Sequence, residues 1–221
     1  MKRFLALFLS LLFLLGSCAA PSSGNAQPSI AATTWPVYCF VSALCDGTGL
    51  AAEQVISEPV SCLHDYTLSI RQMQAIERAD VVICSGGGLE DFMSDALAQA
   101  KAQIDASDGI SLLPGEDGED PHIWLSPENA SRMVENIAEA LITRYPEQAE
   151  KIRSNRDAYQ AELSALQAYG EEQLANLSTR ELITFHDGFA YFAAAFDLTI
   201  LAAIEEESGS EASAAELRSI V

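Results

Sequence analysis

Short apolar segments with strand character alternate with helical segments along most of this chain, and this alternation constrains the fold more than any other feature. Periodicity and turn residues predict strands at 30–34, 54–57, 81–84 and 110–113, and helices at 37–50, 69–78, 89–102 and 127–144. A second alternation has strands at 182–185 and 198–204, a helix at 188–196 and the start of a helix at 212–221. Strands joined by helices at this spacing favour right-handed crossovers. The sequence therefore predicts an α/β fold with parallel sheets.

One long helical segment, at 147–177, separates the two sets of strands, and its apolar residues recur with a helical period. About thirty residues at a rise of about 1.5 Å extend over roughly 45 Å, so we interpret this segment as a strut between two lobes. Gly170 is the position at which we expect a bend. The predicted units are an N-terminal lobe at 30–144, a bridging helix at 145–178 and a C-terminal lobe at 179–221. With only two predicted strands, the second lobe is expected to be incomplete or truncated.

The first residues have the features of a secretory signal peptide over 1–17: Lys2 and Arg3, an apolar run, and small residues before Cys18. Residues 18–29 are polar and small, as in a flexible linker. Leu15-Gly16-Ser17-Cys18 resembles the lipobox of bacterial lipoproteins. That resemblance implies a lipid on Cys18 and anchoring at the outer face of a bacterial membrane, in the periplasm or at the cell surface. An ordinary cleaved signal beside a cysteine is the alternative.

The chain is strongly acidic, with 32 acidic and 12 basic residues and a formal net charge of −20. This balance argues against a nucleic-acid partner and against a patch that binds anionic lipids. It favours attraction of cations only weakly, because most of these carboxylates are expected to lie on a solvated surface.

Four further cysteines follow Cys18, and outside the cytoplasm an even number permits disulfides. Cys39 and Cys45 lie on one predicted helix and point to different faces, so we do not expect them to bond to each other. Cys62 and Cys84 lie at predicted strand-to-loop transitions, and both a disulfide between them and four free thiols remain open. Cys62 is also close in sequence to His64, but we expect its thiol to be directed away from that residue.

The three histidines of the chain, His64, His122 and His186, each follow a predicted strand and precede a predicted helix. In open parallel sheets, ligands gather beyond the carboxyl ends of the strands. Three neutral imidazoles arriving there suit Zn²⁺ and leave one coordination position for water or another group. The neighbouring acids are candidate partners that orient the imidazoles: Asp65, Asp120 and Asp187.

Several motifs occur in a fixed order around the predicted long helix: Thr33-Thr34-Trp35-Pro36-Val37-Tyr38, His64-Asp65-Tyr66, Ala79-Asp80-Val81-Val82, Asp120-Pro121-His122-Ile123-Trp124-Leu125, and Phe185-His186-Asp187 with Phe189-Ala190-Tyr191-Phe192. Together they resemble the cluster A-I metal-binding proteins, the zinc and manganese receptors of ABC importers. The resemblance covers essentially the whole mature chain. It implies two α/β lobes bridged by a long rigid helix, with the metal bound in the cleft between them.

Carried over by that resemblance, His64 and His122 are ligands from the first lobe and His186 is a ligand from the second. Zinc-type members resemble this chain in having histidine at the third place, where manganese members usually have glutamate. The resemblance thus implies Zn²⁺ as the bound ion, with Mn²⁺ as the alternative.

Two departures from the family pattern concern the rest of the site. Members usually continue to an acidic residue that completes the coordination; here the candidates for the fourth position are Glu205, Glu206, Glu207 or water. The histidine-rich loop of some zinc members is also absent, and residues 114–121 instead carry the acids Glu116, Asp117, Glu119 and Asp120.

The predicted function is that of an extracytoplasmic zinc receptor that binds the ion with high affinity and hands it to an ABC importer permease, as a monomer and without catalysis. The alternatives are a truncated remnant that does not transport, a manganese-selective member, and a zinc-dependent hydrolase. A hydrolase is disfavoured because the sequence contains neither a His-Glu-x-x-His motif nor a nucleophile elbow.

Overall fold

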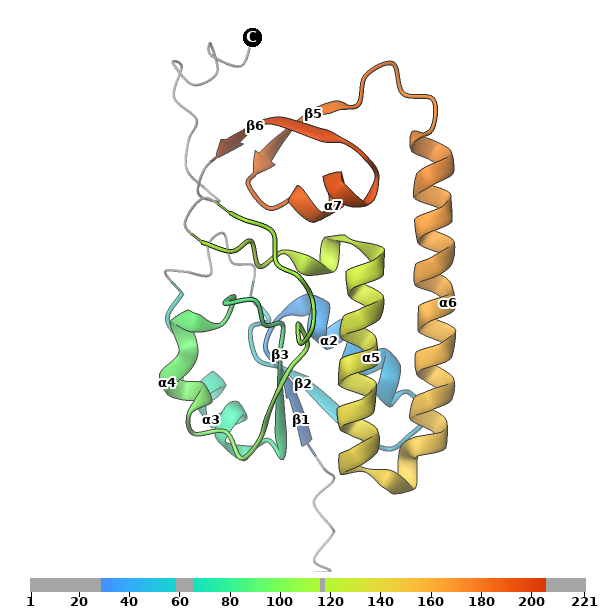
Figure 1. Ribbon diagram of the computed structural model, residues 1–221. Coiled ribbons are helices and arrows are strands. Elements are labelled where there is room, and N and C mark those ends of the chain that lie inside the picture. The colour runs from blue at the N-terminus through green and yellow to red at the C-terminus, as the bar shows by residue number, and fades with distance from the viewer. Residues whose placement is uncertain (1–28, 59–65, 116–117, 206–221) are drawn as a thin grey trace, which may run out of the picture.

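The computed structural model describes residues 29–58, 66–115 and 118–205. Two units are visible in Figure 1, and the long helix α6 (Ala149–Leu174) runs along one side of both. The first lobe holds a four-stranded sheet and lies at residues 29–144. The second lobe holds a two-stranded sheet and one helix, at residues 181–205. This arrangement confirms the predicted α/β fold with parallel sheets and a long bridging helix.

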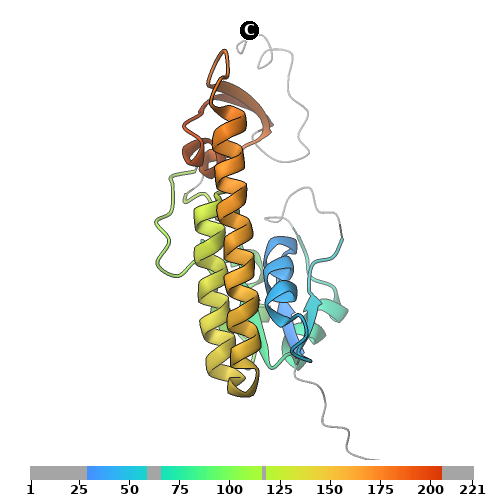
Figure 2. The same cartoon turned by 90° about the vertical axis from the view of Figure 1, so that its right-hand side faces the viewer.

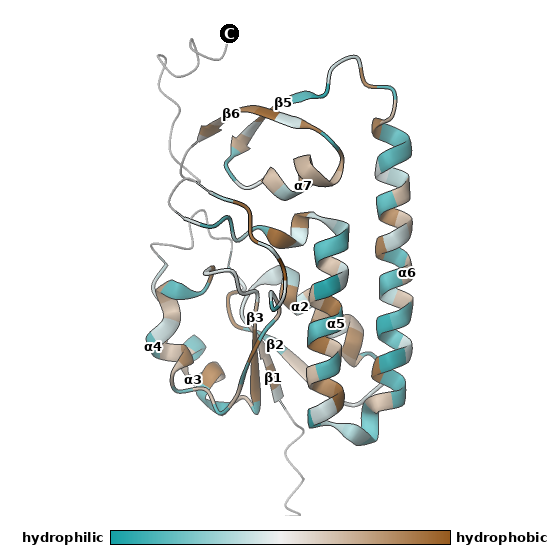
Figure 3. Ribbon diagram, in the orientation of Figure 1, coloured by the Kyte–Doolittle hydropathy of each residue, from teal (hydrophilic) through white to brown (hydrophobic). Residues whose placement is uncertain are grey.

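The sheet of the first lobe is entirely parallel and has the order β2-β1-β3-β4. Its strands are β1 (Ser29–Ala32), β2 (Ala51–Gln54), β3 (Val81–Cys84) and β4 (Gln103–Asp105). The central strand β3 is buried over its whole length, and the apolar colour of β1 and β3 in Figure 3 marks the middle of the sheet. Continuous burial of this kind is typical of a parallel sheet that is covered on both faces.

Side chains alternate along these strands, so successive residues enter two different cores. Ile30 and Ile83 belong to the larger core, which includes residues of α2 (Trp35–Cys45) and α5 (Pro127–Arg144) and the first turns of α6. Ala31 and Val82 belong to the smaller core, with residues of α3 (Ile70–Arg78) and α4 (Ser94–Leu97). Between β3 and α4 lies the 3-10 helix η1 (Asp91–Met93). Both faces of the sheet are therefore covered by helices.

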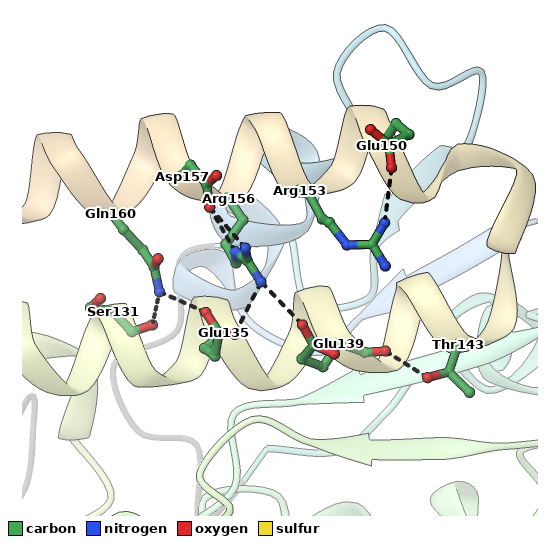
Figure 4. A network of polar contacts seen from close by, with 9 residues as sticks. All are labelled: Ser131, Glu135, Glu139, Thr143, Glu150, Arg153, Arg156, Asp157 and Gln160. Atoms are coloured by element: carbon green, nitrogen blue, oxygen red, sulfur yellow. Dashed lines mark hydrogen bonds and ion pairs between the residues drawn. The ribbon is translucent and has the colours of Figure 1, made fainter.

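Helices α5 and α6 lie side by side and are joined through the short 3-10 helix η3 (Pro146–Gln148), as Figure 2 shows. Polar side chains link them along their length. Arg156 of α6 donates to Glu135 and Glu139 of α5 over 3.1 Å each, and Gln160 donates to Glu135 over 2.9 Å (Figure 4). Nearer its start, α6 buries Ile152 completely in the larger core. The first half of α6 is thus fixed to the first lobe, and its second half extends to the second lobe.

The second lobe contains β5 (Glu181–His186), α7 (Ala190–Ala195) and β6 (Thr199–Glu205), with the two strands parallel. Their register shifts once, between Leu182 and Ile183, so that the pairing continues from Ile183 to Ala202. The side chain of Arg180 joins this lobe to the end of α6, because it donates to the carbonyl oxygens of Leu174 and Asp197 over 3.3 and 2.6 Å.

Helix α6 passes through Gly170 without interruption, and the expected bend is replaced by a close contact. A Cβ atom at Gly170 would lie 2.3 Å from Cε1 and 2.6 Å from Cζ of Phe196, which follows α7. The absence of a side chain at this position therefore lets the Phe196 ring rest directly on the helix. Gly170 serves the packing of the second lobe against α6.

Replacing Gly170 by alanine is expected to destabilise the protein despite the better helix propensity of alanine. The propensity gain is about 1 kcal/mol, whereas overpacking costs about 1–3 kcal/mol. Urea unfolding measures the net change. In a Phe196→Ala background the clash is absent, so Gly170→Ala should there raise the free energy of unfolding; a stabilising effect in the wild-type background would contradict this account.

Several predicted elements match the observed ones, and others do not. Strand β3 and helix α5 have the predicted bounds, and α6 is confirmed to within a turn at each end. The strand predicted at 110–113 is wrong: this segment is irregular, and β4 occupies the position beside β3. Ile110, Leu112 and Leu113 are apolar because they pack against the larger core as a loop.

Three further boundaries differ. The strand predicted at 54–57 lies earlier, as β2, although Val55 and Ile56 continue its hydrogen bonds to the carbonyl oxygens of β1 and Thr33. The helix predicted at 37–50 ends at Cys45, because Gly47 adopts a positive φ of 67°. The helix predicted at 89–102 is reduced to η1 and α4.

None of the helices in the described part of the chain has both the length and the apolar character that a bilayer span requires. The predicted signal peptide at 1–17, the lipid site at Cys18, almost all of the linker at 18–29 and the predicted helix at 212–221 lie outside the described residues.

Candidate metal centre

His122 is held between a long connection and a well-capped helix. It precedes the 3-10 helix η2 (Ile123–Leu125), and its carbonyl oxygen accepts a hydrogen bond from the Leu125 N–H over 3.2 Å. Ser126 caps α5 by accepting from the Asn129 N–H over 3.3 Å, with proline at the first helical position. Ile123 is completely buried and anchors the turn. The backbone around His122 is therefore fixed on both sides.

The buried carboxylate of Asp120 orients the His122 ring. Its Oδ1 lies 2.9 Å from the backbone N of His122 and 2.7 Å from the ring Nδ1 of the same residue. A carboxylate is an acceptor, so this contact assigns the ring proton to Nδ1 and leaves the lone pair of the neutral ring on Nε2. Asp120 thus has the predicted position of a partner that orients an imidazole, and Nε2 is the atom available to a metal.

His186 is the last residue of β5, and its ring meets that of His122 across the two lobes. The two Nε2 atoms are 3.1 Å apart, and the ring planes are inclined at 78° with their centroids 4.9 Å apart. Two nitrogens that bind one tetrahedral ion at about 2.0–2.1 Å must lie about 3.3 Å from each other. The observed separation is close to this requirement. The structure therefore brings together two of the three predicted ligands, which are 64 residues apart in sequence.

Gly188 makes room for this pair of rings. A Cβ atom there would lie 2.9 Å from Nε2 of His186 and 3.0 Å from Cδ2 of His122. Its N–H donates to the His186 carbonyl oxygen over 3.1 Å, which closes a tight turn after β5. The ring of Trp124 lies 5.3 Å from that of His122, measured between centroids.

The third predicted ligand, His64, lies outside the described residues, as do Cys62 and Asp65. The residues on either side of that segment are joined to each other: Tyr66 donates to the Glu58 carboxylate over 3.2 Å. Gln72 of α3 donates to Glu58 over 3.1 Å and to the Tyr66 hydroxyl over 2.7 Å. Among the described residues, no group of three or more His, Cys, Asp or Glu side chains is placed to hold one metal ion.

The remaining predicted site residues have different positions. Asp187 is exposed, whereas the carboxylate that contacts His122 belongs to Asp120. The backbone of Glu205 pairs with that of His186 across the β5–β6 ladder. Glu206, Glu207, Glu116 and Asp117 lie outside the described residues, and Glu119 is exposed.

The described cysteines are free thiols: Cys39, Cys45 and Cys84. Burial raises the pKa of Cys45 to about 12 and also raises that of Cys84, so both thiols stay protonated. The sequence leaves open a Cys62–Cys84 disulfide or four free thiols. The free thiol at Cys84 agrees with the second alternative.

Sequence reasoning missed a buried carboxyl group at the carboxyl edge of the main sheet. Glu90 accepts hydrogen bonds from the Thr33 hydroxyl over 2.6 Å, the Ser85 N–H over 2.7 Å and the Gly86 N–H over 3.0 Å. Burial raises the pKa of Glu90 above its ordinary value of 4.5, and these hydrogen bonds act in the opposite direction. Glu90 thereby connects the ends of β1 and β3. A lone glutamate after three glycines gave no signal of this role.

A family model described as the periplasmic component A of zinc-uptake complexes matches residues 30–221. The chain belongs to this family. The zinc-binding lipoprotein AdcA of Streptococcus pneumoniae is 30% identical over 241 residues, which cover 98% of this chain and 47% of that protein. The iron-binding protein YfeA of Yersinia pestis is 31% identical over 65% of this chain and 49% of its own length. The chain thus spans about half the length of these two relatives.

A solved structure of ZnuA superposes with a TM-score of 0.78 at 30% identity, over 88% of this chain and 76% of that one. The two-lobed fold expected from the sequence motifs is therefore that of the ZnuA family. This family consists of solute-binding proteins.

Proposed function

We propose that this chain is an extracytoplasmic receptor that binds Zn²⁺ and delivers it to the permease of an ABC importer. The observation that carries the proposal is the pair of Nε2 atoms, 3.1 Å apart, that two lobes present to each other. In this proposal residues 30–144 and 179–221 form the lobes, and residues 145–178 form the bridge between them. Ion capture at an interface between lobes requires no chemical conversion, and we propose that the protein is not an enzyme.

The proposed ligands are His122, His186 and His64, and the ring of His122 is oriented by Asp120. The fourth position is proposed for water or for one of Glu205, Glu206 and Glu207. The similarity to AdcA supports zinc. YfeA is named for iron, so the choice of zinc depends on the ligands themselves. Three imidazoles bind Zn²⁺ more strongly than Mn²⁺ or Fe²⁺ according to the Irving–Williams order.

The family description as a component of an uptake complex supports a permease partner. The relative AdcA is named a lipoprotein, which supports a lipid on Cys18 and attachment at the outer face of a membrane. We propose that the receptor acts as a monomer, because the two imidazoles that meet at the centre come from one chain.

Equilibrium dialysis of the purified chain against equimolar Zn²⁺ and Mn²⁺, followed by elemental analysis, tests the proposal. We expect about one zinc ion per chain, as a single three-histidine site implies, and little manganese. Preferential retention of manganese would contradict the choice of metal, and absence of stoichiometric metal would contradict the receptor function. Turnover of an ester, peptide or phosphate substrate that disappears in His122→Ala would instead indicate a zinc hydrolase.

A further inference from the structure

Tyr191 belongs to the second lobe by sequence and to the first lobe by packing. It lies on α7, but the residue is only 3% exposed and is buried in the larger core of the first lobe. Helix α7 also contacts η2, which follows His122. The neighbouring buried residues of this region, Ala193 and Phe196, are not members of that core cluster. Tyr191 is therefore the described α7 residue that enters the larger core.

The Tyr191 hydroxyl completes a ring of hydrogen bonds at the neck of the 113–120 loop. It donates to the Asp120 carbonyl oxygen over 2.8 Å and accepts from the Leu113 N–H over 2.8 Å. The Asp120 N–H in turn donates to the Leu113 carbonyl oxygen over 2.8 Å. The four backbone polar groups of Leu113 and Asp120 are thus satisfied together, and the phenol supplies two of these contacts. Burial raises the pKa of Tyr191, so the hydroxyl keeps the proton that it donates.

Asp120 connects this ring to the metal centre. Its side chain orients His122, whereas its backbone oxygen is held by Tyr191, which lies a short distance beyond His186 in the chain. One continuous path of contacts therefore joins the two imidazoles without using either Nε2 atom. It runs from the His122 ring through Asp120 to Tyr191 and along the α7 segment back to His186.

We propose that Tyr191 is a positioning residue that sets the separation of His122 and His186, and so the affinity of the site for its ion. This inference rests on the proposed zinc-receptor function. The contacts of α6 with the second lobe, at Gly170 and through Gln167, which donates to the Ala195 carbonyl oxygen over 3.3 Å, hold α7 to the bridge. The phenol hydrogen-bonds α7 to both ends of the 113–120 loop, next to His122.

The test is Tyr191→Phe in the full chain, which keeps the ring in the core and removes both hydroxyl contacts. Zinc affinity is measured by competition with a chromophoric chelator, and Co²⁺ replaces Zn²⁺ to report the ligand geometry through its visible absorption. Loss of a residue that orients a metal ligand typically weakens binding by about 10–100-fold. We expect a loss of that size together with changed Co²⁺ bands. Saturating Co²⁺ stabilises the folded state by mass action, so the spectrum remains measurable in a less stable variant.

Tyr145→Phe is the matched control, because it removes a buried phenol oxygen at the opposite end of α5 from the metal centre. It is expected to leave zinc affinity and the Co²⁺ bands unchanged. If Tyr191→Phe lowers the unfolding midpoint but keeps wild-type zinc affinity and wild-type Co²⁺ bands, the residue is merely structural and the inference is overturned. If the wild-type chain itself binds no zinc, the receptor function fails and the inference fails with it.

Discussion

Replacing His122 or His186 by alanine is expected to lower the affinity for zinc by about 100-fold. A full set of four protein ligands contributes about 10–16 kcal/mol of apparent binding free energy, or about 3 kcal/mol for each ligand, and about 1.4 kcal/mol corresponds to a factor of ten. The two Nε2 atoms lie 3.1 Å apart. Removal of either imidazole therefore removes one proposed ligand and leaves the other in place. Chelator competition on each purified variant provides the measurement, and His64→Ala extends it to the third proposed ligand.

The matched control is Glu172→Ala, which removes an exposed side chain from α6. It should bind zinc as the wild type does. Circular dichroism without metal distinguishes loss of a ligand from loss of the fold, because neither imidazole is part of the buried cores. Retention of stoichiometric, tight zinc by all three histidine variants would show that the ion binds elsewhere.

Replacing Glu90 by alanine is expected to lower the free energy of unfolding by about 4 kcal/mol. The carboxyl group accepts from the Thr33 hydroxyl and from the backbone N–H groups of Ser85 and Gly86, all in buried surroundings. Each buried donor that loses its partner costs about 1–3 kcal/mol. Urea unfolding measures the change, and Glu77→Ala on the exposed face of α3 should change it by less than about 0.5 kcal/mol. If Glu90→Ala also lowers the free energy of unfolding by less than about 0.5 kcal/mol, other groups or water satisfy these donors.

Glu90→Gln tests the protonation state of the same group. Because the folded-state pKa of Glu90 is raised, its contribution to stability is complete below its ordinary pKa of 4.5 and declines as the pH rises through the folded-state pKa. Glutamine does not titrate. The wild type should therefore exceed Glu90→Gln in stability most clearly near pH 4, and the difference should shrink toward neutral pH. A difference that grows with pH would show that the hydrogen bonds outweigh burial.

The parts of the fold with strong local signals could be predicted from the sequence. The run of β-branched residues at β3 and the Ser126-Pro127 start of α5 are each visible within a few residues. β4 has no such signal, because this edge strand is polar and largely exposed. The apolar residues at 110–113 have the pattern of a strand instead. Apolar side chains are needed both in a buried loop and in a buried strand, so the pattern does not distinguish the two.

The candidate metal centre could likewise be predicted only in part. The convergence of His122 and His186 is predicted from the sequence, and the structure brings the two rings together. The reason holds for His186, which ends β5, but an irregular connection and not the predicted strand leads to His122. Tyr191 and Glu90 could not be assigned their roles in advance, because most of their partners are backbone groups. Tyr191 reaches Leu113 and Asp120 across 78 and 71 positions of sequence. Backbone groups look alike in every sequence, so only the folded chain identifies which of them a buried side chain meets.

The register shift in the second lobe determines what lies beside His186. Leu182 pairs with Ile200, but Ile183 pairs with Ala202, so Leu201 is the extra residue on β6. Such a bulge moves every later pairing by one position. Had the ladder continued in its initial register, His186 would lie opposite Ile204; with the shift it lies opposite Glu205. A single additional residue in a strand thus changes which residue of β6 pairs with His186 at the edge of the proposed zinc site.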